Sequence, residues 1–210
     1  MELKGLKINF LGDSITEGHG TSGPDKVFHQ LIKKEYKLKE ARNYGISGTR
    51  IAKQSVASEN PKWDMDFLSR CDAMSNDADV VVVFGGTNDY GHGDAKIGNF
   101  DNMDVYTFYG ALRTLMEKLI NKYPGKPIVF MTPLHRSVEE EKGKKLITYV
   151  NIIREVAEYY SIPVLDMYAK SGIQPQVKII EEKFCPDGLH PNDDGHRLMA
   201  ERIGNYLKAL

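Results

Sequence analysis

The stretch that most restricts the fold is ADVVVVFGG, Ala78 to Gly86, in which four consecutive valines and a phenylalanine are flanked by small residues. Valine is branched at Cβ and favours extended backbone. An unbroken apolar run of strand length is typical of a strand that is buried on both faces. The run therefore predicts a central strand of a parallel sheet that has helices on both sides.

The rest of the chain alternates apolar runs of strand length with longer stretches of helical period. Further strands are predicted at residues 7–11, 41–45, 126–133 and 162–168, and the main helices at 27–36, 105–124, 144–160 and 196–210. This alternation is typical of an α/β fold. We find no repeat, low-complexity tract or linker, so we expect residues 1–210 to form one domain, a three-layer α/β/α sandwich around a five-stranded parallel sheet.

Composition excludes several classes of partner. The 28 basic and 29 acidic residues give a formal net charge of −1, so no overall field would attract nucleic acid or an anionic membrane. No apolar run reaches the roughly 18 residues that a membrane span needs, and the amino terminus has no signal-peptide pattern. Cys71 and Cys185 lack the spacing of a zinc site, and we expect free thiols. These features predict a cytoplasmic protein with a small-molecule substrate and no cofactor, and they do not define its oligomeric state.

Polar and glycine residues follow three of the predicted strands at the point where each strand ends. Gly12-Asp13-Ser14 comes after the first strand, GISGTR (45–50) after the second, and Gly85 to Asp89 after the third. Ligands of an open parallel sheet bind at the carboxyl ends of its strands. We therefore expect Ser14, Gly48 and Asn88 to meet at one edge of the sheet.

Late in the chain, CPDGLHPND places Asp187 and His190 three residues apart in a turn, where the carboxylate can reach the imidazole. A serine hydroxyl becomes an effective nucleophile when an imidazole accepts its proton and a third group orients that imidazole. Ser14, His190 and Asp187 match these three roles. The backbone N–H groups of Ser14 and Gly48 and the side-chain amide of Asn88 match the donors of an oxyanion hole.

Taken singly, these residues have other interpretations. Ser14 is a possible helix cap, and Gly48 and Asn88 are common turn residues. The carboxylates near His190, including Asp193 and Asp194, could belong to a divalent-metal site. Loops for hard cations gather more carboxylates, and no second histidine has ligand spacing, so we expect no metal.

Four segments, GDSITEG, NYGISGT, GGTNDYG and DGLHPND, resemble the four sequence blocks of the SGNH hydrolase superfamily, also called GDSL-like lipases and esterases. They occur in the family's order along nearly the whole chain. The resemblance implies a flavodoxin-like fold, Ser14 as nucleophile, His190 and Asp187 as the base and its partner, and Gly48 and Asn88 as oxyanion donors. Members of this superfamily act on lipids, thioesters, acetylated sugars and small aryl esters, so the substrate stays open.

Two polar segments, 89–104 and 133–145, follow the third and fourth strands and are expected to set specificity. Neither has a wide apolar run for a long acyl chain. Candidate substrate-binding residues that can hydrogen-bond or stack on a sugar are Tyr90, His92, His135 and Arg136. Asp13 is grouped with them, although its carboxylate is expected to bond loop amides.

The sequence thus predicts an ester hydrolase that acts on a short acyl group, such as acetyl, carried by a polar alcohol or carbohydrate. Two alternatives stay open. An acyl thioesterase or lysophospholipase would have an apolar acyl groove and a preference for long chains. A carbohydrate-binding protein on the same fold would perform no turnover.

Overall fold

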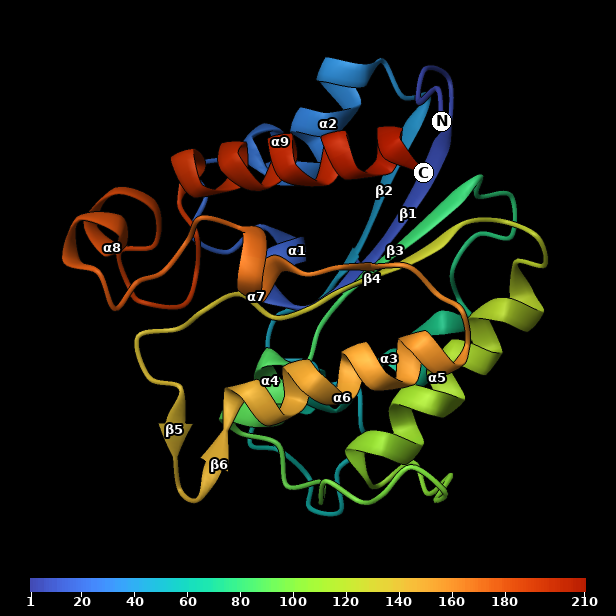
Figure 1. Ribbon diagram of the computed structural model, residues 1–210, viewed down its shortest axis with the longest axis vertical. Helices are drawn as coiled ribbons and strands as arrows, with labels where there is room; N and C mark the ends of the chain where they lie inside the picture. The colour runs from blue at the N-terminus through green and yellow to red at the C-terminus, as the bar shows by residue number, and fades with distance from the viewer.

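A computed structural model describes residues 1–210 and contains a central parallel sheet of five strands (Figure 1). Their order across the sheet is β2-β1-β3-β4-β7, which is the flavodoxin-like order, so the predicted fold class is confirmed. The strands are β1 (Lys7–Gly12), β2 (Glu40–Gly45), β3 (Val80–Phe84), β4 (Ile128–Met131) and β7 (Val164–Leu165).

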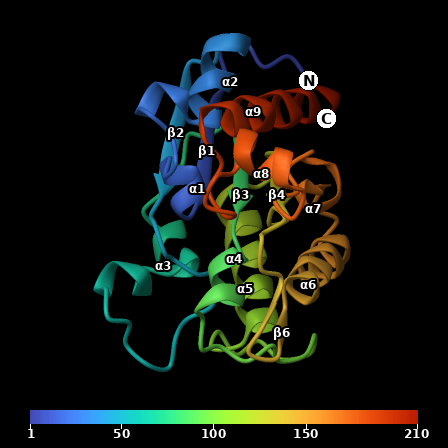
Figure 2. The same cartoon turned by 90° about the vertical axis from the view of Figure 1, so that its left-hand side faces the viewer.

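Helices cover both faces of this sheet and bury two separate cores. One core lies against α2 (Phe28–Tyr36) and α9 (Asp193–Ala209) and takes in Val80 and Val82 of β3. The other lies against α3 (Phe67–Cys71), α5 (Phe108–Lys122) and α6 (Leu146–Tyr159) and takes in Val81 and Val83. Alternate valines therefore face opposite cores, which confirms the predicted burial of this strand on both faces. In Figures 1 and 2, α9 lies beside α2, near both chain termini.

Several helix boundaries are set by side-chain caps. Helix α5 begins after Thr107, whose Oγ1 accepts a hydrogen bond of 3.2 Å from the N–H of Gly110. Helix α9 begins three residues before the predicted start, because the side chain of Asn192 accepts from the N–H groups of Asp194 and Gly195. The predicted long helices all occur, and their ends shift by a few residues.

Short elements that the sequence analysis did not predict surround the carboxyl edge of the sheet. They are α1 (Ser14–Glu17), η1 (Pro24–Lys26), η2 (Pro61–Asp64), α4 (Thr87–Gly91), α7 (Met167–Lys170), α8 (Lys178–Phe184) and a small hairpin of β5 (Glu140–Glu141) and β6 (Lys144–Lys145). Both cysteines are buried free thiols, as expected. No helix of the chain is both long enough and apolar enough to cross a membrane.

Candidate active site

Ser14, His190 and Asp187 form a continuous chain of hydrogen bonds at the carboxyl edge of the sheet. The Oγ of Ser14, the first residue of α1, lies 3.0 Å from Nε2 of His190. The Nδ1 of His190 lies 2.6 Å from Oδ2 of Asp187. The other Asp187 oxygen accepts from the N–H groups of Leu189, at 2.9 Å, and of His190, at 2.6 Å. The turn between the two residues therefore orients the imidazole toward Ser14.

The surroundings of this chain favour a neutral imidazole beside a charged carboxylate. Burial lowers the pKa of His190 below its ordinary value and outweighs the opposite influence of Asp187. Burial acts to raise the pKa of Asp187, but the hydrogen bonds from His190 and Leu189 hold that pKa below its ordinary value. At neutral pH the ring can accept a proton from Ser14, which is the state that a general base requires.

Three hydrogen-bond donors belong to segments that follow β1, β2 and β3: the N–H groups of Ser14 and Gly48 and the side-chain amide of Asn88. Ser14 begins a helix, so its N–H has no partner within that helix, and the N–H of Gly48 donates to no other residue. Asn88, in α4, is 6% exposed, and its Nδ2 donates to the carbonyl of Thr49 at 3.0 Å. That bond orients the amide and leaves its second hydrogen free. All three groups lie at the carboxyl ends of neighbouring strands, and each has an N–H available for a ligand.

Gly48 satisfies two constraints that no other residue type satisfies. Its φ is +75°, in the region that favours glycine. A Cβ at this position would lie 2.1 Å from Cδ1 of Trp63, so the indole ring lies directly on the glycine. Any side chain here would displace either the ring or the backbone N–H.

Two buried carboxyl groups bond the amides of the active-site loops. Asp13 is 2% exposed, and its Oδ1 accepts from the N–H of Ile15 at 3.1 Å. Asp89 is equally buried and accepts from the N–H groups of Ile51 and Ala52 at 3.0 and 2.9 Å. Burial raises the pKa of Asp13 to about 7 and that of Asp89 to about 6. The contacts of Asp13 fit the expected bonding of loop amides and leave it little surface for a substrate.

The sequence analysis missed Arg70, which lies beneath the site. Its side chain donates to the carbonyls of Gly12, at 3.1 Å, and Met65, at 2.9 Å, to the carbonyl of Tyr44, and to Oγ1 of Thr49, at 2.8 Å. One guanidinium thus joins the ends of β1 and β2 to the loop that carries Gly48. Arginine in a short helix has no sequence signal for this role, because its partners come from distant segments.

The residues predicted to bind substrate are mostly engaged with the protein. Tyr90 is 2% exposed, and its hydroxyl donates to the carbonyl of Val138 at 3.2 Å. Arg136 donates to the carbonyl of Thr87 at 3.0 Å, with its guanidinium 5.1 Å from the centre of the Tyr90 ring. His135 lies half-buried, with Nδ1 2.6 Å from Glu139. Tyr90 therefore packs against the Arg136 guanidinium and has almost no surface for a substrate.

His92 lies at a hollow beside the loop that carries Gly48. Its ring faces that of Trp63, with the ring centres 4.9 Å apart, and its Nδ1 accepts from Arg50 at 3.3 Å. Arg50 is buried and also donates to Asp64 at 2.6 Å. The hollow has a volume of about 270 Å³ and is mostly lined by polar residues: Arg50, Gln54, Val56, Ala57, Ser58, Glu59, Trp63, His92 and Asp94.

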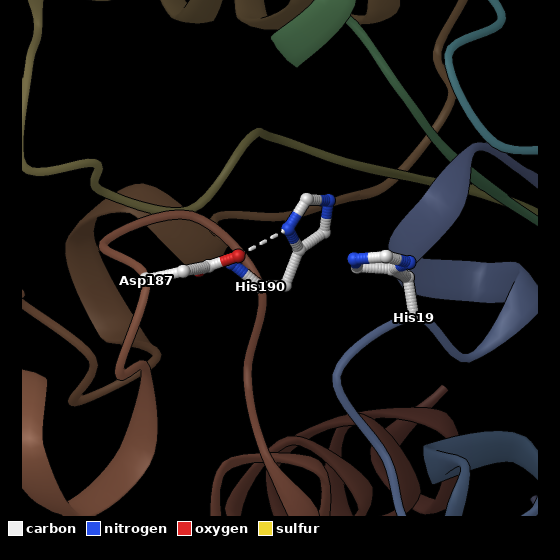
Figure 3. Close-up of side chains that lie close together, drawn as sticks. All are labelled: His19, Asp187 and His190. Carbon is white, nitrogen blue, oxygen red and sulfur yellow. Dashed lines mark hydrogen bonds and ion pairs between the residues drawn. The ribbon is translucent and has the colours of Figure 1, made fainter.

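His19, in the loop after α1, was not among the predicted site residues. Figure 3 shows its ring beside that of His190, and the two ring centres are 4.3 Å apart. The sequence analysis found no second histidine at ligand spacing from His190, and the His19 contact joins segments that are far apart in sequence. The sequence contains no signal for this contact.

Comparisons with known proteins give a consistent family assignment. The sequence profile of the GDSL-like lipase/acylhydrolase family matches residues 10–198. An acetylxylan esterase from Xylanibacter ruminicola is 26% identical over 97% of this chain, which spans 43% of the length of that esterase. A GDSL esterase/lipase from Arabidopsis thaliana is 24% identical over 96% of this chain and 86% of its own length.

Solved structures share the fold along the whole chain. A protein from Lactobacillus plantarum superimposes with a TM-score of 0.85 at 28% identity and covers 98% of both chains. A possible lipase from Chitinophaga pinensis gives a TM-score of 0.73 at 22% identity, with 97% of this chain and 98% of its own covered. The second likeness concerns the fold alone.

Proposed function

Since the chain belongs to the GDSL-like lipase/acylhydrolase family, we propose that it is a serine hydrolase that cleaves carboxylic esters through an acyl-enzyme intermediate. The observation that carries this proposal is the hydrogen-bonded series from Ser14 through His190 to Asp187. A serine beside a neutral, oriented imidazole is the arrangement that nucleophilic acyl transfer needs. The free N–H groups of Ser14 and Gly48 also support the proposal, because they can bind the oxyanion that this attack creates.

The reaction has two steps. Nε2 of His190 accepts the proton of Ser14 while the hydroxyl oxygen attacks the ester carbonyl, and Asp187 stabilises the resulting imidazolium. The oxyanion is bound by the N–H groups of Ser14 and Gly48 and by the amide of Asn88. His190 then gives its proton to the departing alcohol. A water molecule, activated by the same imidazole, attacks the acyl-serine, releases the acid and restores the free hydroxyl.

For the substrate, we propose a short acyl group such as acetyl on a polar alcohol or carbohydrate. The hollow next to the Gly48 loop is small, and six of its nine lining residues are polar or charged, Arg50, Ser58 and Asp94 among them. Trp63 offers a ring face of the kind that stacks on sugars. The acetylxylan esterase name of one relative agrees with this substrate class.

The first test needs no assumption about the substrate. The wild type and Ser14→Ala would each be incubated with a small fluorophosphonate and measured by intact-mass spectrometry. We expect one adduct on the wild type and none on the variant. An unmodified wild type that is folded would refute the proposed nucleophile and favour a binding protein on this fold.

A second test addresses the acyl group. Hydrolysis of acetyl and octanoyl esters of one alcohol would be compared, followed by acetylated xylo-oligosaccharides. We expect the acetyl ester to give the higher kcat/KM. Much faster hydrolysis of the octanoyl ester would reject the short-acyl proposal and favour a lysophospholipase or thioesterase.

A further inference from the structure

His19 brings to the active site a second imidazole that the proposed hydrolysis does not use. Its side chain is exposed, and its ring makes no hydrogen bond with another residue. Figure 3 shows the ring directed toward His190, which is in turn bonded to Asp187. Both nitrogens of His19 are therefore free for a ligand shared with its neighbours.

Backbone packing brings the two rings together. A Cβ on Gly20 would lie 2.6 Å from the carbonyl oxygen of Pro191 and 3.2 Å from Cβ of His190, so the two loops are in direct contact. Ser22 continues this attachment, because its N–H and hydroxyl bond the carboxylate of Asp193 at 2.8 and 2.6 Å. The fold therefore fixes the nearness of the two loops, and the His19 side chain lies within reach of His190.

The ligand atoms of this cluster suit one class of metal ion. One atom each from His19, Asp187 and His190 lies within 4.8 Å of the other two. Two imidazoles and a carboxylate are typical ligands of Zn²⁺, which binds histidine nitrogen at about 2.0–2.1 Å in a tetrahedral site. Ligands at that range lie about 3.4 Å apart. Rotation of the exposed His19 side chain brings its nitrogen closer, while Asp187 Oδ2 and His190 Nδ1, now 2.6 Å apart, move about 0.8 Å away from each other to admit the ion. A fourth position is left for water.

We propose that His19, Asp187 and His190 bind one divalent transition-metal ion such as Zn²⁺, and that the bound ion reversibly blocks ester hydrolysis. An ion bound by all three side chains lies on the Nδ1 side of His190, because Asp187 contacts that nitrogen. It displaces the hydrogen bond that orients the ring toward Ser14, and proton transfer stops. Inhibition rests on the proposed function, whereas binding of the ion does not.

The test compares the metal-free wild type with His19→Ala in a buffer that does not bind zinc. Zinc affinity would be measured by isothermal titration calorimetry, and inhibition by the rate of acetyl ester hydrolysis. We expect one zinc ion per wild-type chain and full recovery of activity with EDTA. His19→Ala should keep its zinc-free rate while both affinity and inhibition weaken at least tenfold. Mg²⁺ should not inhibit, because hard cations prefer oxygen ligands.

His135→Ala is the matched control, because it removes a half-buried histidine outside the cluster and should leave zinc affinity unchanged. Equal zinc affinity or equal inhibition in the wild type and His19→Ala would overturn the proposal. Absence of zinc binding to the wild type would overturn it too. If no ester were hydrolysed, calorimetry would still decide the metal site, so failure of the proposed function and failure of this inference are distinguishable.

Discussion

Replacing Arg70 by lysine would test whether one buried guanidinium holds the active-site loops together. Arg70 is 8% exposed, and burial lowers its pKa to about 10, so it stays charged at neutral pH. Its nitrogens donate to four acceptors, which belong to Gly12, Tyr44, Met65 and Thr49. Lysine keeps the charge but carries a single nitrogen on a flexible stem, so it cannot reach all four acceptors at once.

The expected cost follows from the acceptors that lose their donor. Lysine has three N–H groups on one atom, so at least one of the four hydrogen bonds is lost, and a hydrogen bond to a charged group contributes about 1.5–3 kcal/mol. After local relaxation, the free energy of unfolding should fall by about 2–4 kcal/mol. Gly48 lies between Tyr44 and Thr49 in the chain, so its N–H should also lose its position. We expect kcat for ester hydrolysis to fall by at least about tenfold.

Urea unfolding, followed by circular dichroism and by the fluorescence of the single tryptophan Trp63, would give the free energy of unfolding. Arg197→Lys is the control, because the Arg197 side chain is 72% exposed and bonds only Asp194. It should stay within about 0.5 kcal/mol of the wild type. If Arg70→Lys unfolded within about 1 kcal/mol of the wild type and retained its kcat, the holding role of this guanidinium would be refuted.

Three further predictions concern the site. Asn88→Ala should lower kcat by about 10²–10³-fold, or about 3–4 kcal/mol, with little change in KM. The reason is that the amide bonds the oxyanion of the transition state more strongly than the carbonyl oxygen of the bound ester. An unchanged kcat in steady-state assays would remove Asn88 from the oxyanion hole. Burial lowers the pKa of His190 below its ordinary 6.5, so kcat/KM should rise with pH and reach half its plateau below pH 6.5. A pH–rate profile with its midpoint above that value would contradict this. Burial raises the pKa of Asp13 to about 7, whereas an Asp in the unfolded chain has a pKa near 4. Between these two values the folded chain binds a proton that the unfolded chain does not bind. Lowering the pH through this range therefore adds to the free energy of unfolding. Asp13→Asn has no carboxyl group to take up this proton. On acidification its free energy of unfolding should fall relative to that of the wild type, by up to about 1.4 kcal/mol per pH unit. Urea midpoints that change in parallel for both proteins between pH 7 and 5 would refute the raised pKa.

The architecture was largely predictable from the sequence. The valine run of β3 has alternate residues in two cores, so its apolar pattern alone predicts burial on both faces. The short helices α1, α4 and α8 escaped prediction because a helix of one or two turns is too short to show an apolar stripe. The two-residue strand β7 was predicted too long, because the apolar run extends beyond the backbone that pairs with β4.

The reactive groups were predictable for a different reason. Asp187 and His190 lie in one turn, where three residues of spacing suffice to join carboxylate and imidazole. Ser14 and Asn88 each follow a strand that the apolar pattern identifies, and parallel strands end at one edge. The structure brings these predicted residues together, and their catalytic roles stay predictions for the experiments above.

The groups that hold and surround the reactive residues follow no such local rule. A carbonyl at the end of a strand can accept from any donor that the fold brings near, so nothing requires that donor to be Arg70 or to come from α3. In the same way, His19 meets His190 only because a glycine lets two distant loops touch. Chemistry therefore restricts the sequence spacing of the reactive groups, whereas the contacts of Arg70 and His19 arise only from nearness in the folded chain. Variants of Arg70 and His19 therefore test the surrounding residues separately from the reactive ones, since neither residue takes part in proton transfer with Ser14.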